Sequence, residues 1–340
     1  MQSQQPAVIF PDSAQVLYLV VPCYNEEAVL AETTRQLTDK LRGMIEQGLI
    51  SPLSRILYVN DGSKDNTWGL IRQFYDANPL VLGLSLSRNR GHQNALLAGL
   101  MTAKEHADMV ISLDADLQDD IGVIDQFVKK YYEGCDVVYG VRSSRKTDTF
   151  FKRFTAQSFY KLMSGLGVDV VYNHADYRLM SRRALNELQN FKEVNLFLRG
   201  IVPLIGFKSD VVEYERHNRF AGESKYPLKK MLSFAFDGIT SFSVKPIRFI
   251  TTLGIVIFTI SIVMLLYFFI VYLCGKTVAG WTSIVVSVWA IGGLQLLAIG
   301  IIGEYIGKIY MESKARPKFI IDEFLDDAGK AQTGGDKSCK

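Results

Sequence analysis

Cysteine is scarce in this sequence of 340 residues, which contains Cys23, Cys135, Cys274 and Cys339. Their wide separation matches neither the short spacing of zinc ligands nor a disulfide framework. We therefore expect reduced thiols, which fits a cytoplasmic location for the soluble part of the chain. An excess of charge of one sign is also lacking, since 38 Lys and Arg stand against 35 Asp and Glu. A chain this balanced is not expected to be a general nucleic-acid binder.

The common nucleotide-binding and nucleophile motifs are absent as well. The sequence has no G-x-x-x-x-G-K-[ST] loop, and no G-x-G-x-x-G follows the first predicted strand. No Ser/His/Asp or Cys/His set is apparent, and the 4 histidines do not have metal-ligand spacing. Residues 1–15 are polar and the apolar run 16–21 is short, so we expect no signal peptide. A nucleotide would have to be held through a metal ion and basic side chains instead.

Two long runs, 249–273 and 281–303, contain no charged residue. At ~1.5 Å per helical residue, each is long enough to cross a hydrocarbon core of ~30 Å; a pair of buried core helices is the alternative. Basic residues flank the outer ends of the pair, namely Lys245, Arg248, Lys308, Lys314, Arg316 and Lys318. Because basic flanks mark the cytoplasmic side, we expect a two-helix transmembrane hairpin with both termini in the cytoplasm.

Residues 1–240 alternate between short apolar runs and longer amphipathic segments. The apolar runs are 16–21, 56–59, 81–86, 109–113 and 137–141. The segments between them show helical spacing, as at Val29, Leu37 and Leu41. Strands that alternate with helices predict an α/β fold with a mostly parallel sheet. Ligands of such sheets bind beyond the carboxyl ends of the strands.

Polar residues follow each of these predicted strands, and Asp114 and Asp116 form the sharpest signal among them. Two carboxylates two positions apart at a strand end can share a hard cation such as Mg²⁺ or Mn²⁺, with Gln118 as a neutral oxygen ligand. The alternative is a solvated acidic turn or a helix N-cap, because Asp119 and Asp120 follow and a helix is expected soon after them. The polar residues at the other strand ends favour the metal site.

Four strand-end segments carry a family resemblance: PCYNEE (22–27), NDGS (60–63), SRNRGHQNAL (87–96) and DADLQD (114–119). It continues in DYRLM (176–180), FLRG (197–200), IGF (205–207) and RFAGESKY (219–226). In this order the segments resemble family 2 glycosyltransferases with a GT-A fold. With two C-terminal spans, the chain is similar to polyprenyl-phosphate glycosyltransferases, which include bactoprenol glucosyltransferases and, more distantly, dolichyl-phosphate mannose synthase. The resemblance covers residues 16–318.

This resemblance implies roles for individual residues. The residues implied for nucleotide binding are Pro22, Tyr24, Glu26, Asp61, Arg88, Asp114 and Ala115. Those implied for holding a divalent cation, Mg²⁺ or Mn²⁺, are Asp114, Asp116 and Gln118. The implied catalytic residues are Asp176, Arg142 and Arg219. The residues implied to face the lipid phosphate or the leaving diphosphate are Arg142, Arg153, Arg219 and Lys225. The sequence departs from some relatives, which carry Gly-Lys-Glu, at His92, Gln93 and Asn94.

The implied reaction is inverting, metal-dependent transfer of a sugar from a UDP-sugar to polyprenyl (undecaprenyl) phosphate at the cytoplasmic face of the plasma membrane. The resemblance to bactoprenol glucosyltransferases favours glucose, and N-acetylglucosamine or a GDP-sugar donor are the alternatives. Because the acceptor phosphate is already an anionic nucleophile, Asp176 would either orient it or act as a base. The alternative of another class is a non-catalytic membrane scaffold on a glycosyltransferase fold.

The expected domain order is a cytoplasmic GT-A domain (1–218), a juxtamembrane amphipathic segment (219–248), two transmembrane helices (249–307) and a cytoplasmic C-terminal tail (308–340). Basic and aromatic residues mix within the juxtamembrane segment, which suits contact with membrane lipids. Gly303 and Gly307 suit close helix packing, either in a homo-oligomer or within the hairpin. The expected partners are thus a nucleotide-sugar donor, a polyprenyl phosphate acceptor and membrane lipids, without nucleic acid.

Overall fold

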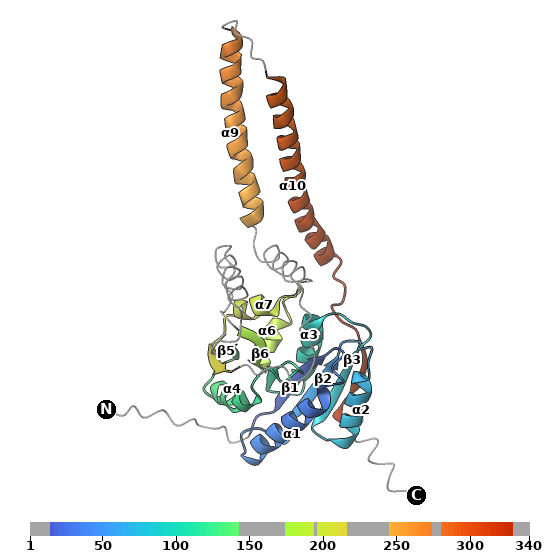
Figure 1. The fold of residues 1–340 in the computed structure, drawn as a ribbon. Helices are drawn as coiled ribbons and strands as arrows, with labels where there is room; N and C mark the ends of the chain where they lie inside the picture. The colour runs from blue at the N-terminus through green and yellow to red at the C-terminus, as the bar shows by residue number, and fades with distance from the viewer. Residues whose placement is uncertain (1–13, 143–173, 194–195, 216–244, 274–279, 329–340) are drawn as a thin grey trace, which may run out of the picture. The chain divides into compact units, whose positions relative to one another are not determined.

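The computed structural model describes residues 14–142, 174–193, 196–215, 245–273 and 280–328. These residues belong to two compact units (Figure 1). The first unit holds the described residues up to 215 together with those from 317 onward, and the second holds those from 245 to 316. The chain therefore returns to its first unit at its C-terminal end.

One mixed sheet forms the centre of the first unit, in the order β7-β5-β6-β4-β1-β2-β3-β8. Its strands are β1 (Leu17–Cys23), β2 (Arg55–Asn60), β3 (Val81–Leu86), β4 (Met109–Ser112), β5 (Val137–Arg142), β6 (His174–Ser181), β7 (Ser209–Tyr214) and β8 (Ile321–Leu325). The pairs β1-β2, β1-β4, β2-β3 and β5-β7 are parallel, whereas β4-β6, β5-β6 and β3-β8 are antiparallel. The mostly parallel α/β sheet is thus confirmed, and the five apolar runs of the sequence are β1 to β5.

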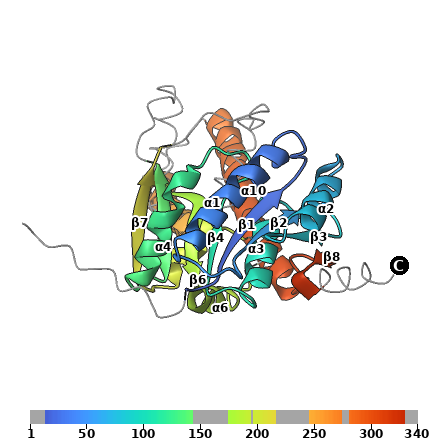
Figure 2. The ribbon, with the colours of Figure 1, turned by 90° about the horizontal axis from the view of Figure 1, so that it is seen from below.

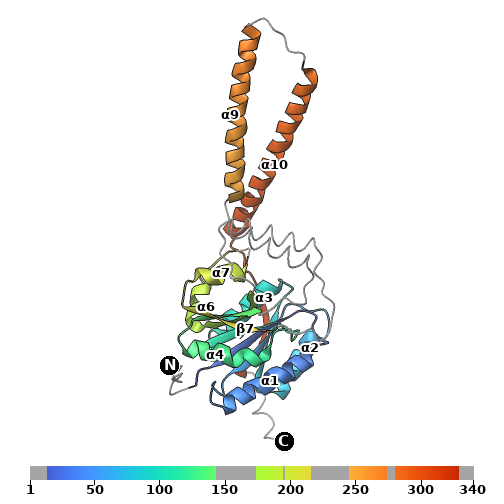
Figure 3. The same ribbon diagram turned by 60° about the vertical axis from the view of Figure 1, so that its left-hand side comes forward.

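Helices cover both faces of this sheet (Figures 2 and 3). On one face lie α1 (Leu30–Glu46), α2 (Thr67–Ala77) and α4 (Ile124–Tyr132), with the short helix η1 (Ile121–Val123) before α4. The other face carries α3 (His92–Ala103), α6 (Arg182–Leu188) and α7 (Leu198–Leu204). Leu37 and Leu41 of α1 are fully buried in one core cluster with Leu19 of β1, as their helical spacing predicts.

Helix α3 approaches the sheet closely at Gly99. A Cβ atom at this position would lie 2.4 Å from Cγ1 of Val20 and 2.7 Å from Cγ2 of Val59. Because such distances are far inside van der Waals contact, glycine is needed here for α3 to pack on β1 and β2. The N-terminus of α3 is thereby held beside the carboxyl ends of those strands.

Strand β6 runs against its neighbours, and this orientation determines what lies at the sheet edge. His174 pairs with Val141 near the end of β5, and Arg178 pairs with Ser112 at the end of β4. The Oγ atom of Ser112 also donates a hydrogen bond to the backbone carbonyl of Asp176. The beginning of β6 therefore lies at the edge where β1 to β5 end, which is the edge where the sequence predicts ligand binding.

Strand β8 lies within the segment that the sequence predicts to be a C-terminal tail. The sequence assigned all of 308–340 to a tail, but residues 321–325 pair with β3 as the edge strand of the sheet. The backbone N–H of Ser87 donates to the carbonyl of Ile320 at 3.0 Å, and Arg55 forms an ion pair with Asp327 at 3.1 Å. A run of five residues with two acidic side chains has too little apolar pattern to predict a strand, especially one that pairs with a partner so distant in sequence.

We expect the loss of β8 to destabilise the first unit. A chain ended before Ile321 would expose the edge of β3, whose residues are all buried. Since ~1 kcal/mol changes Tm by roughly 2–4 °C in a domain of this size, Tm should fall by at least several degrees, and the open edge should promote aggregation. Thermal unfolding in detergent measures this, with a chain ended after Ala328 as the control. Equal Tm values for the two truncations would contradict a structural role for β8.

The second unit contains two long helices, α9 (Lys245–Leu273) and α10 (Trp281–Ser313), which include the charge-free runs of the sequence. Several large apolar side chains on them are exposed, among them Ile255, Ile260, Leu266, Leu296 and Ile299. Among the residues that the structure describes, one segment, Ile291–Ser313, is long and apolar enough to cross a membrane. One segment does not establish a two-helix hairpin, which therefore stays a prediction.

Candidate active site

The loops that follow β1 and β2 are joined by hydrogen bonds at the carboxyl edge of the sheet. Asn25 adopts a left-handed backbone conformation with φ 56°, and its Oδ1 accepts from the backbone N–H of Lys64 at 2.8 Å. The N–H of Glu26 donates to Oγ1 of Thr67 at 2.9 Å. Tyr24, which precedes Asn25, is 41% exposed. The structure thus brings the first-loop residues of the predicted nucleotide pocket beside the loop that begins with Asp61.

Asp61 joins this pair of loops to the loop after β3. Its side chain is buried, and its carboxylate accepts from the backbone N–H of Arg90 at 2.7 Å and of Gly91 at 2.9 Å. Burial raises the pKa of Asp61 above its ordinary value, although the two N–H groups oppose the shift. A Cβ at Gly62 would lie 2.6 Å from the backbone nitrogen of Asn89, so this turn requires glycine. The predicted loop of Arg88 is therefore packed against Asp61 and Gly62, while the Arg88 side chain is exposed.

The sequence allowed two roles for the aspartates of the loop after β4, cation binding and helix capping. Asp120, and not Asp114 or Asp116, caps the following helix: its Oδ1 accepts from the N–H of Gly122 at 2.7 Å. Asp116 is 7% exposed, and its Oδ1 accepts from the N–H of Gln118 at 3.1 Å. The helix-cap alternative is therefore wrong for Asp114 and Asp116, whereas an acidic turn held by Asp116 is present.

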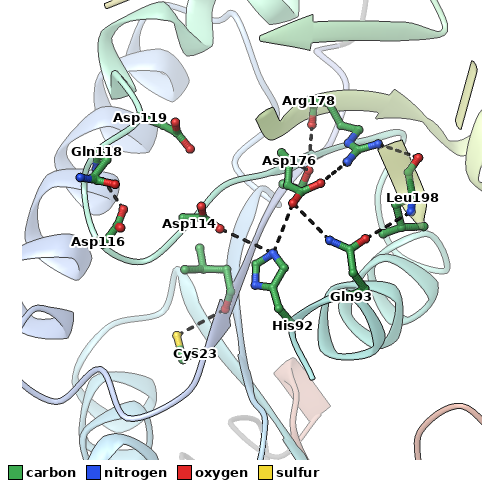
Figure 4. Close-up of polar contacts among 12 residues, drawn as sticks. Cys23, His92, Gln93, Asp114, Asp116, Gln118, Asp119, Asp176, Arg178 and Leu198 are labelled. Atoms are coloured by element: carbon green, nitrogen blue, oxygen red, sulfur yellow. Dashed lines mark hydrogen bonds and ion pairs between the residues drawn. The ribbon is translucent and has the colours of Figure 1, made fainter. Parts of the chain in front are cut away.

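Asp114, Asp116 and Gln118 offer a partial set of ligands for a hard cation (Figure 4). The Asp114 side chain is 43% exposed, and the carbonyl of the intervening Ala115 accepts a hydrogen bond from Oγ1 of Thr33 at 2.7 Å. No three His, Cys, Asp or Glu side chains of the described residues are grouped to hold a metal ion. Two carboxylates and an amide oxygen are nevertheless the donor type that Mg²⁺ and Mn²⁺ prefer, so the residues fit a cation that takes its other ligands from phosphate oxygens.

A second polar group lies beside the acidic loop, formed by Asp119, Tyr214 and Arg142. The Tyr214 hydroxyl donates to Oδ1 of Asp119 at 2.6 Å, and Nε of Arg142 lies 3.5 Å from the Tyr214 oxygen. Burial, followed by the charge of Asp114, raises the pKa of Asp119 to about 6. Arg142, at the end of β5, is half-buried. The structure therefore brings this predicted arginine to the same edge as the acidic loop.

Asp176, near the beginning of β6, binds two arginines, Arg178 and Arg199, and Figure 4 shows the contact with Arg178. Its Oδ1 accepts from NH2 of Arg178 at 2.6 Å and from Nε of Arg199 at 3.2 Å, and its Oδ2 accepts from NH2 of Arg199 at 3.0 Å. Burial alone would raise the pKa of Asp176, but Arg199 foremost, with His92 and Arg178, outweighs it and holds this pKa well below its ordinary value. Such a carboxylate stays ionised and is a weak proton acceptor.

His92 connects the acidic loop with Asp176. Its Nε2 lies 3.7 Å from Oδ1 of Asp114 and 3.6 Å from Oδ2 of Asp176. The amide of the next residue, Gln93, also donates to Oδ2 of Asp176, at 3.2 Å. The sequence assigned no role to His92, Gln93 or Arg199. All three lie within the quoted motif segments, but no rule of spacing links them to Asp176, because sheet pairing and the packing of α7 bring them together.

Three predicted site residues, Arg153, Arg219 and Lys225, lie outside the described residues, as does most of the predicted juxtamembrane segment. Their roles stay predictions. The structure brings the other predicted residues to one edge of the sheet.

The chain is similar in sequence to a known protein family and to several named proteins. Residues 18–189 match the family described as glycosyl transferase family 2. The chain is 61% identical over 310 residues to an uncharacterized glycosyltransferase, YkoT, of Bacillus subtilis, covering 91% of this chain and 92% of that protein. It is 42% identical to the bactoprenol glucosyl transferase of Shigella phage SfV, covering 89% and 97% of the two chains. A prophage bactoprenol glucosyl transferase homolog of Escherichia coli is 39% identical, with the same coverage.

Proposed function

The chain belongs to glycosyl transferase family 2, and from that premise we propose that it transfers glucose from UDP-glucose to polyprenyl (undecaprenyl) phosphate with inversion at the anomeric carbon. The observation that carries the proposal is similarity at about 40% identity, over most of the chain, to proteins named bactoprenol glucosyl transferase. Among the described residues, the carboxylates of Asp114, after β4, and Asp176, near the beginning of β6, support it with a site of matching chemistry.

The donor side of the proposed site is the edge formed by the loops after β1, β2 and β3. Tyr24 and Asp61 would contact the base and ribose, and Arg88 would contact the phosphates. Asp114 and Asp116, with Gln118, would hold a divalent cation, which when bound stabilises the charge of the leaving diphosphate as a Lewis acid. Arg142 would add charge-assisted hydrogen bonds at the same diphosphate.

The acceptor side needs no strong base. A phosphomonoester has its second pKa at about 6, so the acceptor oxygen is anionic near neutral pH. Asp176, whose pKa is held well below its ordinary value, is accordingly proposed to orient Arg178 and Arg199 and not to abstract a proton. Direct displacement by the phosphate oxygen in a single step inverts the anomeric carbon.

The acceptor is a lipid, so the reaction is proposed to take place at the cytoplasmic face of the plasma membrane. The apolar segment Ile291–Ser313 supports attachment to a bilayer. The second span, over 249–273, and contact of Arg153, Arg219 and Lys225 with lipid phosphate are parts of the same proposal. Its domain order is a cytoplasmic catalytic domain, a juxtamembrane segment and a membrane hairpin.

Removal of divalent cations is expected to abolish transfer. Because Asp114 and Asp116 supply only part of a coordination shell, the bound cation should exchange readily with a chelator. Lipid-linked glucose formation should fall to background in EDTA and return when Mn²⁺ or Mg²⁺ is added in excess. Full activity in EDTA, with metal analysis confirming that no cation remains, would contradict the metal dependence.

A donor screen tests the proposed function as a whole. Membranes containing the protein would be incubated with undecaprenyl phosphate, Mn²⁺ or Mg²⁺, and each common UDP- or GDP-sugar in turn. Lipid-linked product with UDP-glucose is the expected result. If product formed only with UDP-N-acetylglucosamine or a GDP-sugar, the proposed donor would be wrong and the proposed reaction class would still hold. No product with any donor would favour a non-catalytic membrane scaffold.

A further inference from the structure

The side chain of Gln93 joins two elements of the candidate site (Figure 4). Gln93 lies in the first turn of α3, where its Nε2 donates to Oδ2 of Asp176 at 3.2 Å. Its Oε1 accepts from the backbone N–H of Leu198, the first residue of α7, at 3.2 Å. The orientation of the amide follows from these partners, because a carboxylate requires a donor and an N–H requires an acceptor.

These two hydrogen bonds are part of a closed ring. Arg178 donates to the backbone carbonyl of Leu198 at 3.2 Å through NH1 and to Asp176 at 2.6 Å through NH2. Gln93 completes the ring on the other side, between Asp176 and the N–H of Leu198. Arg199, the residue after Leu198, then binds both oxygens of Asp176. The backbone that carries Arg199 and the carboxylate that orients it are therefore held by the same ring.

Few side chains other than glutamine can make both of these hydrogen bonds at position 93. It must offer one donor and one acceptor, uncharged, at the length of a glutamine. Glutamate would keep the acceptor for Leu198 but place a second negative charge against Asp176. Leucine would leave both partners with one hydrogen bond fewer.

We propose that Gln93 is a positioning residue for sugar transfer, which fixes the orientation of the Asp176 carboxylate and, through it, the guanidinium of Arg199. This inference rests on the proposed function, because it assigns Gln93 to the catalytic step of that reaction. The predicted donor contacts lie in the loops after β1 to β4, whereas the two hydrogen bonds of Gln93 reach Asp176 and Leu198. The loss of Gln93 should therefore reduce kcat and leave the donor KM nearly unchanged.

Two substitutions separate the two hydrogen bonds of Gln93. Gln93→Leu removes both, and Gln93→Glu removes the donor to Asp176 while keeping the acceptor for Leu198. Both variants should lose kcat by about ten- to hundredfold, the range for a lost hydrogen bond to a charged group, with donor KM within about twofold. Gln36→Leu is the matched control, because Gln36 donates one hydrogen bond to Glu32 on the outer side of α1; its kinetics should equal those of the unchanged protein.

A double-mutant cycle tests whether Gln93 acts through Asp176. If it does, Gln93→Leu should cost little further kcat once Asp176→Asn is present, so the two effects should be clearly less than additive. Additive losses in the cycle, or normal kcat in Gln93→Glu, would overturn the proposal. If Gln93→Leu does not fold, the isosteric Gln93→Glu decides the question.

Hydrogen exchange provides a readout that does not require turnover. Amides of α7 should exchange faster than in the unchanged protein in Gln93→Leu and stay protected in Gln93→Glu, because only glutamate keeps the acceptor for Leu198. Equal protection in Gln93→Leu and the unchanged protein would contradict the ring. An unchanged protein without transferase activity toward any donor would refute the proposed function and with it the catalytic role of Gln93, whereas normal activity in the Gln93 variants would refute the inference alone.

Discussion

Asp116→Asn is expected to abolish sugar transfer and to leave the fold intact. The substitution removes one of the two carboxylates proposed to hold the cation, while an asparagine oxygen can still accept the hydrogen bond from Gln118 N–H that Asp116 accepts at 3.1 Å. Electrostatic stabilisation by a bound cation contributes several kcal/mol, so kcat/KM should fall by roughly a thousandfold. The measurement is lipid-linked glucose formation by purified protein at saturating Mn²⁺, together with Tm.

Asp120→Asn is the matched control for this experiment. It makes the same change of charge in the same loop, but Asp120 caps η1 through a hydrogen bond from Gly122 N–H, and asparagine is an equally good cap. Activity within about threefold of the unchanged protein is expected. If Asp116→Asn retained normal transfer, or if both substitutions lowered it equally, the assignment of Asp116 to the cation would fail.

Asp176→Asn is expected to lower both stability and activity. Arg178 is 1% exposed, so neutralising Asp176 leaves a buried guanidinium without its carboxylate. Removing one partner of a buried ion pair costs about 3–5 kcal/mol, and the free energy of unfolding should fall by that amount. Because Arg199 loses the carboxylate that orients it, kcat should fall by at least a hundredfold as well. Chemical unfolding in detergent and the transfer assay measure the two effects.

Asp39→Asn shows what the same substitution does at an exposed ion pair. Asp39 lies 3.2 Å from Arg35, and both side chains are about 60% exposed. Such an exposed pair contributes little to stability, so the free energy of unfolding and transfer should hardly change. A stability loss in Asp176→Asn no larger than that in Asp39→Asn would contradict the buried ion-pair network.

The apolar runs of the sequence were sufficient to predict β1 to β5 and the polar edge at which they end. A buried parallel strand must be apolar along its length, and its turn must carry polar residues, so both signals are local. Strand β8 has no such signal, because none of its five residues is buried and it pairs with β3, which lies more than 200 residues earlier in the chain. Local pattern cannot identify such a partner.

Within the candidate site, the sequence singled out the acidic residues but not most of the side chains that contact them. Asp114, Asp116 and Asp176 belong to short motifs, whereas the contacts of Asp176 with Gln93 and Arg199 join three separate elements. The sequence could not decide which aspartate of the acidic loop caps the helix, because Asp116 and Asp120 have the same side chain. The backbone geometry assigns the cap to Asp120. Side-chain function here depends on tertiary packing that no residue spacing encodes.

Anomalous diffraction from crystals grown with UDP-glucose and Mn²⁺ tests the central claim most directly. The account predicts a manganese peak between the diphosphate of the donor and the carboxylates of Asp114 and Asp116, with Asp176 still paired to Arg178 and Arg199. A donor diphosphate bound elsewhere, or a manganese peak at which neither Asp114 nor Asp116 is a ligand, would contradict it.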